Sequence, residues 1–273
     1  MKLATIRLGS TTTAVRQEGD EVVELDATDV GEVLQRPDWR DWAAAADGAR
    51  RSSQDLDFAP LITRPENVFC VGMNYRAHVA EMGRELPSHP ALFAKFRRAL
   101  IGANDDIVLP PESDMVDWEA ELAIVIGRPT RRVSVAAAAD AIAGYTIVND
   151  VSMRDWQNRT TQFLQGKTWE HCTPVGPYLV TADESPGPSR QISCEVDGEV
   201  MQLADTADLV FDAFTLVSYI STLITLEPGD LIATGTPSGV GAGRSPQRFL
   251  APGNVVVTSI EGLGQCRNLC RKE

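Results

Sequence analysis

Short runs of apolar residues dominate this chain from residue 67 onward, and their lengths are those of β-strands. The strand-like runs are residues 68–71, 122–126, 145–148, 178–180, 192–196, 231–234 and 255–260. Helical patterns are fewer and occur at residues 77–82, 135–141 and 210–223. This order is too rich in strands and too irregular for a doubly wound fold, in which strands and helices alternate. The pattern predicts a mainly β protein with short helices, of the α+β class.

The first 62 residues show a different pattern. Alternating runs and short helical segments occur there, namely strands at 5–8, 13–16 and 21–25 and helices at 28–34 and 39–46. The polar stretch 50–57 is a candidate linker, and Pro60 and Pro65 bracket the entry to the rest of the chain. We therefore predict a small N-terminal α/β domain at residues 1–62 and a larger domain at residues 63–273.

Two acidic residues interrupt an apolar run at residues 117–127. Alternate side chains of a strand share a face, so Glu119 and Glu121 would point to one side and apolar neighbours such as Trp118 to the other. Two like charges side by side repel each other. A divalent cation is the simplest way to offset that repulsion, because hard cations take carboxylate oxygens as ligands.

Asp150 ends another apolar run, residues 144–149, and could bring a third carboxylate to the same place. Three carboxylates suit Mg²⁺, Mn²⁺ or Ca²⁺ better than Zn²⁺, which prefers nitrogen and sulfur ligands. From the residues alone an alternative stays open, in which both glutamates pair with arginines on an exposed strand face.

Cationic and amide side chains follow this third acid. Arg154 and Gln157 are three residues apart and share one face of a helical turn, and Lys167 follows them. Such donors suit an anionic, oxygen-rich substrate or a developing oxyanion. The alternative is a polar loop with ordinary surface ion pairs.

His78 and Glu81 lie three residues apart in a predicted helix, so the carboxylate can orient the imidazole. An oriented neutral histidine is a common general base, although an exposed helix with an incidental pair is the alternative. Residues 235–243 are rich in glycine but lack the Lys-Ser/Thr ending of a phosphate-binding loop. We interpret them as a tight loop that presents Thr236 and backbone N–H groups to a binding site.

Composition narrows the classes of function. A formal net charge of −13 over 273 residues argues against nucleic-acid binding and against binding to an anionic membrane surface. The longest apolar run, residues 213–226, is too short and too interrupted to cross a bilayer. The N-terminus lacks a signal-peptide core and the five cysteines are an odd number, so we expect reduced thiols in a cytoplasmic protein.

Taken together, these segments resemble the fumarylacetoacetate hydrolase family over residues 65–270. The matching segments are residues 71–75, 78–81, 117–122, 149–150, 154–157, 166–168, 174–177 and 226–237. The ordered set is far more specific than any one motif. One departure is the segment 93–96, which ends in Phe96 where the family more often has proline. That difference concerns the entrance of the substrate pocket.

The resemblance implies a mixed β-sandwich roll of the fumarylacetoacetase C-terminal type at residues 63–273, usually as a homodimer, behind the small N-terminal domain. It implies magnesium or manganese (Mg²⁺ or Mn²⁺) as the cofactor, with the metal ligands Glu119, Glu121 and Asp150. The remaining roles that it implies are catalytic for His78, Glu81 and Lys167 and substrate-binding for Tyr75, Arg154, Gln157 and Thr236.

These parts favour a metal-dependent hydrolase that cleaves a C–C bond in a 2,4-dioxo acid, such as an acylpyruvate, to pyruvate and a carboxylic acid. The metal would act as a Lewis acid on the 2-oxo acid end, and His78, oriented by Glu81, would deprotonate the attacking water. A lid at residues 76–89 and the loop 158–165 would select the acyl group.

The same machinery supports alternative functions. Within the enzyme class these are decarboxylation of oxaloacetate and isomerisation of a 2-oxo acid, in which a double bond or a keto–enol proton moves. A protein that binds a small oxo acid without turning it over is the remaining alternative.

Overall fold

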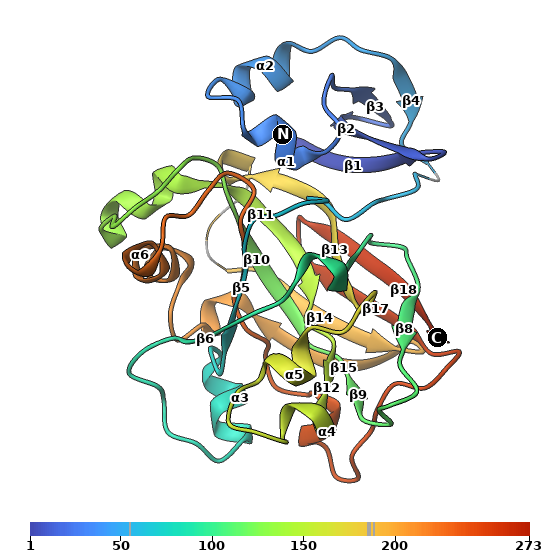
Figure 1. The fold of residues 1–273 in the computed structure, drawn as a ribbon, viewed down its shortest axis with the longest axis vertical. Coiled ribbons are helices and arrows are strands. Elements are labelled where there is room, and N and C mark those ends of the chain that lie inside the picture. Colours follow the sequence, from blue (N-terminus) through green and yellow to red (C-terminus); the bar gives the residue numbers. More distant parts are fainter. Residues whose placement is uncertain (55, 185–186, 188) are drawn as a thin grey trace.

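The structure is a computed structural model that describes residues 1–54, 56–184, 187 and 189–273. Strands dominate it, and the two larger sheets pack against each other (Figure 1). Apolar residues of both sheets form the core between them, among them Leu122, Ile147, Ile192, Val256 and Cys266. The predicted mainly β fold with short helices is confirmed.

The larger sheet extends from the N-terminal unit through the middle of the molecule. Its strands in spatial order are β4 (Arg50–Ser52), β3 (Glu21–Glu24), β2 (Thr11–Glu18), β1 (Lys2–Leu8), β13 (Thr173–Thr181), β11 (Ile142–Asn149), β10 (Ala120–Ile126), β16 (Leu231–Ala233), β5 (Val68–Gly72) and β6 (Ala91–Ala94), with β7 (Leu100–Ile101) beside β13. Every residue of β10 is buried, which explains its nearly continuous apolar sequence.

The second sheet packs across the first. Its strands in spatial order are β15 (Glu199–Asp205), β14 (Gln191–Val196), β17 (Val255–Ile260), β18 (Gly264–Lys272) and β8 (Ile107–Leu109), and a separate pair joins β12 (Ser152–Met153) to β9 (Val116–Asp117). The sequence pattern predicts neither β15 nor β18. Their inward positions include Gln202 and Asn268, which lack the branched apolar side chains that mark a strand.

Short helices complete the fold. The α-helices are α1 (Val30–Leu34), α2 (Trp39–Ala45), α3 (Arg76–Glu81), α4 (Arg154–Gln157), α5 (Leu164–Lys167) and α6 (Ala213–Leu223), and the 3₁₀-helices are η1 (Arg97–Ala99), η2 (Val135–Ala141), η3 (Ala182–Glu184), η4 (Thr206–Asp208) and η5 (Gly241–Gly243). The helix α6 begins later than predicted because Asp212 caps it, accepting the N–H of Thr215 at 2.8 Å. No helix of the described residues is long and apolar enough to cross a membrane.

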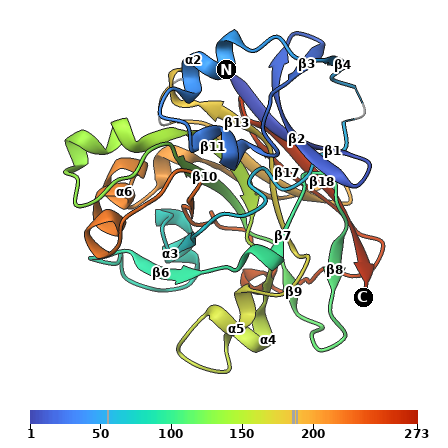
Figure 2. The ribbon, with the colours of Figure 1, turned by 45° about the horizontal axis from the view of Figure 1, so that its top comes forward.

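The N-terminal unit, β1–β4 with α1 and α2, lies at the top of Figure 1. Its strand β1 pairs with β13, so the N-terminal strands continue the larger sheet (Figure 2). The predicted linker at 50–57 begins with β4, which pairs with β3, while Asp55 lies outside the described residues. The division into domains at residue 62 stays a prediction.

Candidate metal and substrate site

The strand β10 and the residues before it carry apolar and acidic side chains on opposite faces, as the alternation predicts. Trp118 and Leu122 pack in the core between the two sheets. Ala123, which has the same parity as Glu119 and Glu121, packs in the cluster on the other face. Both glutamates therefore point away from the sandwich core.

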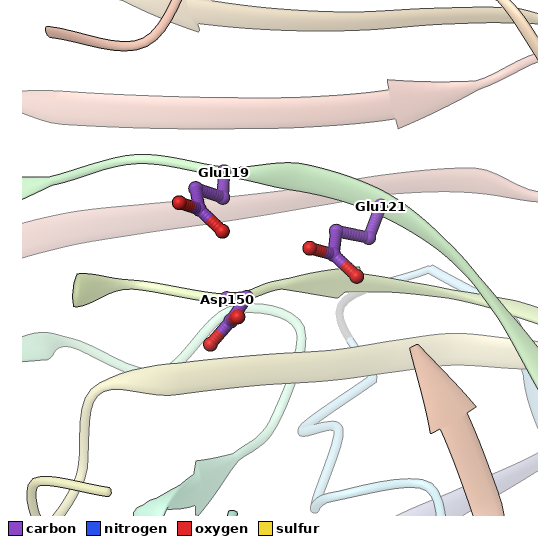
Figure 3. A group of neighbouring side chains, drawn as sticks. All are labelled: Glu119, Glu121 and Asp150. Atoms are coloured by element: carbon purple, nitrogen blue, oxygen red, sulfur yellow. The ribbon is translucent and has the colours of Figure 1, made fainter. Parts of the chain in front are cut away.

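Three carboxylates converge although they come from two strands (Figure 3). The ligand oxygens of Glu119, Glu121 and Asp150 all lie within 4.8 Å of one another, and all three residues are buried. The register between β10 and β11 pairs Ala120 with Asn149, and the N–H of Asp150 donates to the carbonyl of Glu119 at 2.8 Å. Oxygen donors at this spacing fit Mg²⁺ or Mn²⁺.

Two buried lysines contact the carboxylates. Lys167 Nζ lies 2.6 Å from Glu119 Oε2 and 2.8 Å from Asp150 Oδ2. Lys95 Nζ lies 2.5 Å from Asp150 Oδ1 and donates to the carbonyl of Val151 at 3.0 Å. The lysines fix both oxygens of Asp150. The alternative in which both glutamates pair with arginines on an exposed strand face is wrong, because Glu119 and Glu121 are buried.

The two glutamates differ in their charged neighbours. Burial by itself raises the pKa of Glu119, but Lys167 and Arg154 outweigh it and hold that pKa at about 2. Glu121 accepts the N–H of Gly235 at 2.8 Å, and its burial beside the other carboxylates raises its pKa well above the ordinary range. A divalent cation next to Glu121 would favour its ionised form, so the donor set fits a metal.

Gly235 must be glycine for this contact to form. Its φ of +100° is in a region that L side chains avoid, and a Cβ there would lie 2.8 Å from the carbonyl oxygen of Val71. The absent side chain lets the loop after β16 bring its N–H to Glu121.

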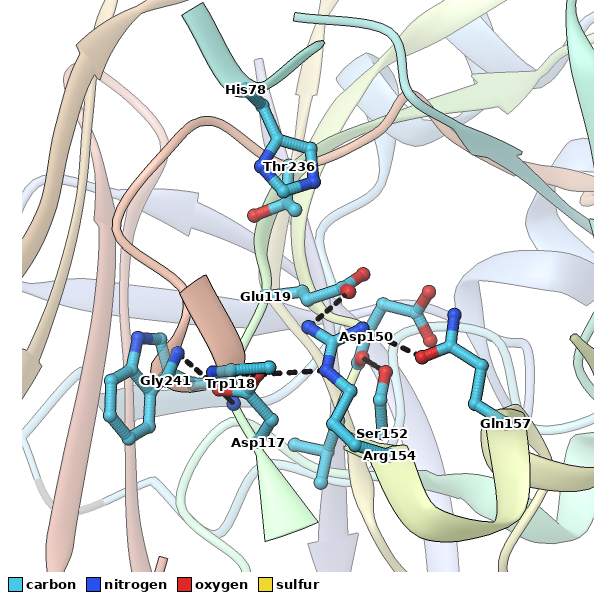
Figure 4. A network of polar contacts seen from close by, with 12 residues as sticks. His78, Asp117, Trp118, Glu119, Asp150, Ser152, Arg154, Gln157, Thr236 and Gly241 are labelled. Carbon is cyan, nitrogen blue, oxygen red and sulfur yellow. Dashed lines mark hydrogen bonds and ion pairs between the residues drawn. The ribbon is translucent and has the colours of Figure 1, made fainter. Parts of the chain in front are cut away.

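Arg154 connects the carboxylates to this loop (Figure 4). Its Nη2 lies 2.7 Å from Glu119 Oε1, and its Nε donates to Asp117 Oδ2 at 2.8 Å. Asp117 also accepts the N–H of Gly241 at 2.7 Å. Arg154 Nη1 donates to Gln157 Oε1 at 2.8 Å, so the two residues share the turn α4 as predicted.

The predicted histidine–glutamate pair forms on α3. His78 Nδ1 lies 2.9 Å from Glu81 Oε2, and Glu81 Oε1 accepts the N–H of Gly239 at 3.0 Å. The loop after β16 therefore holds Glu81, and Glu81 in turn holds one ring nitrogen of His78. Among the described residues the other ring nitrogen, Nε2, makes no hydrogen bond, and His78 lines a cavity.

One cavity of about 470 Å³ adjoins these groups, although Asp150 and Glu81 do not line it. The predicted site residues that line it are His78, Glu119, Glu121, Arg154, Gln157, Lys167 and Thr236. The lid and the loop contribute Met82, Arg84, Asn158, Thr160, Thr161 and Phe163, and the segment 93–96 contributes Phe93. The cavity thus has charged side chains at one part of its lining. Polar and apolar side chains from the lid (76–89) and the loop 158–165, which we expect to select the acyl group, form another part.

Tyr75 and Phe96 lie apart from this lining. Tyr75 is buried, and its hydroxyl has no hydrogen-bond partner among the described residues. Burial, with Glu121 nearby, raises the pKa of Tyr75 well above its ordinary value. Phe96, in the position of the family's proline, is 57% exposed at the surface.

Three further buried residues belong to the site and were not predicted. They are Lys95, Asp117 and Gln202, whose Nε2 donates to Thr236 Oγ1 at 2.8 Å. A charged residue inside an apolar run is the signal that could have identified Lys95 and Asp117. The sequence around Gln202 carries no comparable signal.

Comparisons with known proteins find similar sequences and similar structures. The family profile described as fumarylacetoacetate (FAA) hydrolase C-terminal matches residues 67–271. The chain is 46% identical over 213 residues to the mitochondrial oxaloacetate tautomerase FAHD2A of Bos taurus, a match that covers 77% of this chain and 68% of that protein.

Two solved structures are similar along the whole chain. Fumarylacetoacetate hydrolase from Exiguobacterium antarcticum has a TM-score of 0.90 at 31% identity, covering 100% of both chains. Maleylpyruvate hydrolase from Sphingobium sp. SYK-6, in complex with manganese(II) ion and pyruvate, has a TM-score of 0.81 at 26% identity, covering 100% of this chain and 99% of that one.

Proposed function

We propose that this chain, which belongs to the fumarylacetoacetate hydrolase family, is a metal-dependent isomerase that interconverts the keto and enol forms of oxaloacetate. The observation that carries the proposal is that Glu119, Glu121, Lys167 and His78 line the same cavity. The 46% identical relative named as an oxaloacetate tautomerase supports this alternative more than the C–C hydrolysis that the sequence favours.

Glu119, Glu121 and Asp150 would hold Mg²⁺ or Mn²⁺, and the manganese in the maleylpyruvate hydrolase structure supports a metal of this kind. When bound, the ion would polarise the 2-oxo group of the substrate as a Lewis acid. Lys167 and Arg154 would place further positive charge beside the oxygen that becomes negative.

His78 is the side chain placed to move the proton. In tautomerisation the C3–H bond breaks, its electron pair forms the C2=C3 double bond, and the oxygen on C2 gains a proton. Glu81 binds Nδ1 of His78 at 2.9 Å, so Nε2 can take the proton from C3 and return it in the reverse direction.

The test starts from the enol form of oxaloacetate and follows the decay of its ultraviolet absorbance with Mn²⁺-loaded protein. We expect decay faster than with Mn²⁺ alone. Pyruvate is measured in the same samples, and acetylpyruvate is supplied in parallel as a hydrolase substrate. The proposal is wrong if enol decay stays at the metal-only rate while oxaloacetate loses CO₂ or acetylpyruvate is cleaved.

Hydrolysis of a 2,4-dioxo acid is the second candidate, and the size of the cavity favours it. A volume of about 470 Å³ leaves room for a substrate larger than a four-carbon acid. The similar maleylpyruvate hydrolase supports it as well. His78→Ala separates decarboxylation from tautomerisation and hydrolysis, because decarboxylation needs neither an attacking water nor removal of a C3 proton. Loss of all three activities together would mean that His78 mainly closes the lid.

We also propose that the protein acts on a small oxo acid as a cytoplasmic homodimer. Light scattering of the purified protein tests the dimer. Imaging of the tagged full chain tests the location, which needs its own experiment because the Bos taurus relative is named as mitochondrial.

A further inference from the structure

Gln202 is a buried residue of the second sheet, and its side-chain amide contacts the loop after β16. It lies in β15, is 1% exposed and does not line the cavity. Its side chain contacts Ala120 in β10 and both Thr236 and Pro237 in the loop after β16. A buried amide with partners on two segments has a single possible arrangement when one partner can only donate and another can only accept.

Two backbone groups fix which end of the amide is which. The N–H of Ala120 can only donate, and it lies 3.0 Å from Gln202 Oε1. The carbonyl of Pro237 can only accept, and it lies 2.9 Å from Nε2. A rotation of the amide by half a turn would place a donor against a donor and an acceptor against an acceptor. The assignment of oxygen and nitrogen therefore follows from the network.

The remaining N–H of Gln202 determines whether the Thr236 hydroxyl donates or accepts on the side that faces Gln202. It donates to Thr236 Oγ1 at 2.8 Å, so the threonine oxygen acts as an acceptor on that side. Within the described parts of the chain, the Thr236 hydroxyl has no acceptor for its own hydrogen. Because Thr236 lines the cavity, that hydrogen is available as a donor to a ligand.

We propose that Gln202 is a positioning residue that holds the Thr236 hydroxyl as a donor for a carboxylate oxygen of the substrate. The inference rests on the proposed function, since it takes the ligand to be an anionic 2-oxo acid. Thr236 is the residue that touches the ligand, and Gln202 acts through it. A hydroxyl fixed in advance as a donor favours a carboxylate over a ligand group that can only donate.

The test is a double-mutant cycle of Gln202→Met and Thr236→Val in the Mn²⁺-loaded full-length protein. The readouts are the dissociation constant for pyruvate, the KM and kcat for oxaloacetate, and the affinity for Mn²⁺. We expect each single variant to weaken pyruvate binding and raise KM roughly tenfold or more, with a smaller change in kcat. The double variant should be no worse than Thr236→Val, and Thr236→Ser should retain binding.

Asn268→Met is the matched control for the loss of a buried amide. Asn268 Nδ2 donates to the carbonyl oxygen of Asp105 at 2.7 Å, and Asn268 does not line the cavity. We expect a lower melting temperature but wild-type pyruvate binding.

If Gln202→Met does not fold, Gln202→Glu replaces it. An ionised carboxylate there accepts from Ala120 and from the Thr236 hydroxyl, and its second oxygen faces the Pro237 carbonyl. The hydrogen of the Thr236 hydroxyl then points away from the ligand, so binding should weaken at least as much.

The outcomes separate this inference from the proposed function. Wild-type binding by Gln202→Met, or a further loss when it is added to Thr236→Val, would overturn the positioning role. Failure of the wild-type protein to bind pyruvate would also overturn it. If the wild type binds pyruvate but does not convert oxaloacetate, the tautomerase proposal fails while the cycle in pyruvate binding still decides the role of Gln202.

Discussion

Glu121 accepts a backbone N–H but makes no ion pair with a lysine or arginine in the described parts of the chain. Glu121→Gln keeps the size of the side chain and removes its charge. We expect the affinity for Mn²⁺ to fall by about 100-fold or more, with loss of turnover, because one of three anionic ligands is gone. Calorimetric titration with Mn²⁺ measures this, and the exposed Glu112→Gln is the control. Metal-dependent turnover at the wild-type level in Glu121→Gln would contradict the site.

The protonation of Glu121 predicts a pH dependence. Burial and the neighbouring carboxylates raise its folded-state pKa well above the ordinary 4.5. The bound proton stabilises the metal-free fold fully below pH 4.5, and that contribution is lost as pH rises through the raised pKa. Metal binding needs the ionised carboxylate, so it should release up to about one proton and become tighter as pH rises.

Calorimetry at a series of pH values, each in two buffers that differ in their heat of ionisation, measures this proton release. Different binding enthalpies in the two buffers are expected for the wild-type protein below the raised pKa of Glu121. Equal enthalpies would mean that Glu121 is already ionised before the metal binds.

At the scale of elements, the loop after β16 depends on Asp117. This carboxylate accepts the N–H groups of Gly241 at 2.7 Å and Ala242 at 3.0 Å and also binds Arg154. Asp117→Asn places an amide donor against these donors and removes a buried charge pair. We expect a loss of about 3–5 kcal/mol in the free energy of unfolding and a fall of roughly 100-fold in kcat/KM, because Arg154 and the loop shift.

Chemical denaturation and steady-state kinetics test the prediction for Asp117. The control is Asp197→Asn, which changes a carboxylate that accepts the N–H of Val255 in an exposed turn. We expect this control to change stability by less than about 1 kcal/mol and to leave kinetics unchanged. Normal kinetics in Asp117→Asn would show that the loop holds its position without this carboxylate.

At the scale of the whole molecule, the pairing of β1 with β13 predicts that the N-terminal unit and the rest of the chain unfold together. Leu3 is fully buried in a cluster that includes Ala123 of β10 and Leu179 of β13. Leu3→Ala should lower the free energy of unfolding by about 2–5 kcal/mol in a single transition.

Scanning calorimetry of Leu3→Ala distinguishes one transition from two, with the exposed Leu203→Ala as the control. A separate low-temperature transition that leaves the main one in place would show that the N-terminal unit folds as a domain of its own. In that case the division at residue 62 would describe folding as well as sequence.

The apolar runs predicted most of the strands, because a buried strand shows itself in the sequence by local alternation and by β-branched side chains. The strand β10 and both clusters on its faces follow from that pattern. The strands β15 and β18 escaped prediction because their buried positions include Gln202 and Asn268, which pack by hydrogen bonds.

The spacing of residues along the chain is enough to predict the local features of the site. A two-residue spacing in a strand puts Glu119 and Glu121 on one face, and a three-residue spacing in a helix brings Glu81 to His78. These relations depend only on the geometry of the element.

The distant side chains that complete the site are brought there by the packing of the whole chain. Lys167 reaches Glu119 across 48 residues of sequence, and Gln202 reaches Thr236 across 34. Lys95 reaches Asp150 across 55. Strand register and the packing of the two sheets select these partners. A periodic pattern shows that a side chain is buried, but it carries no information about which distant residue will lie beside it.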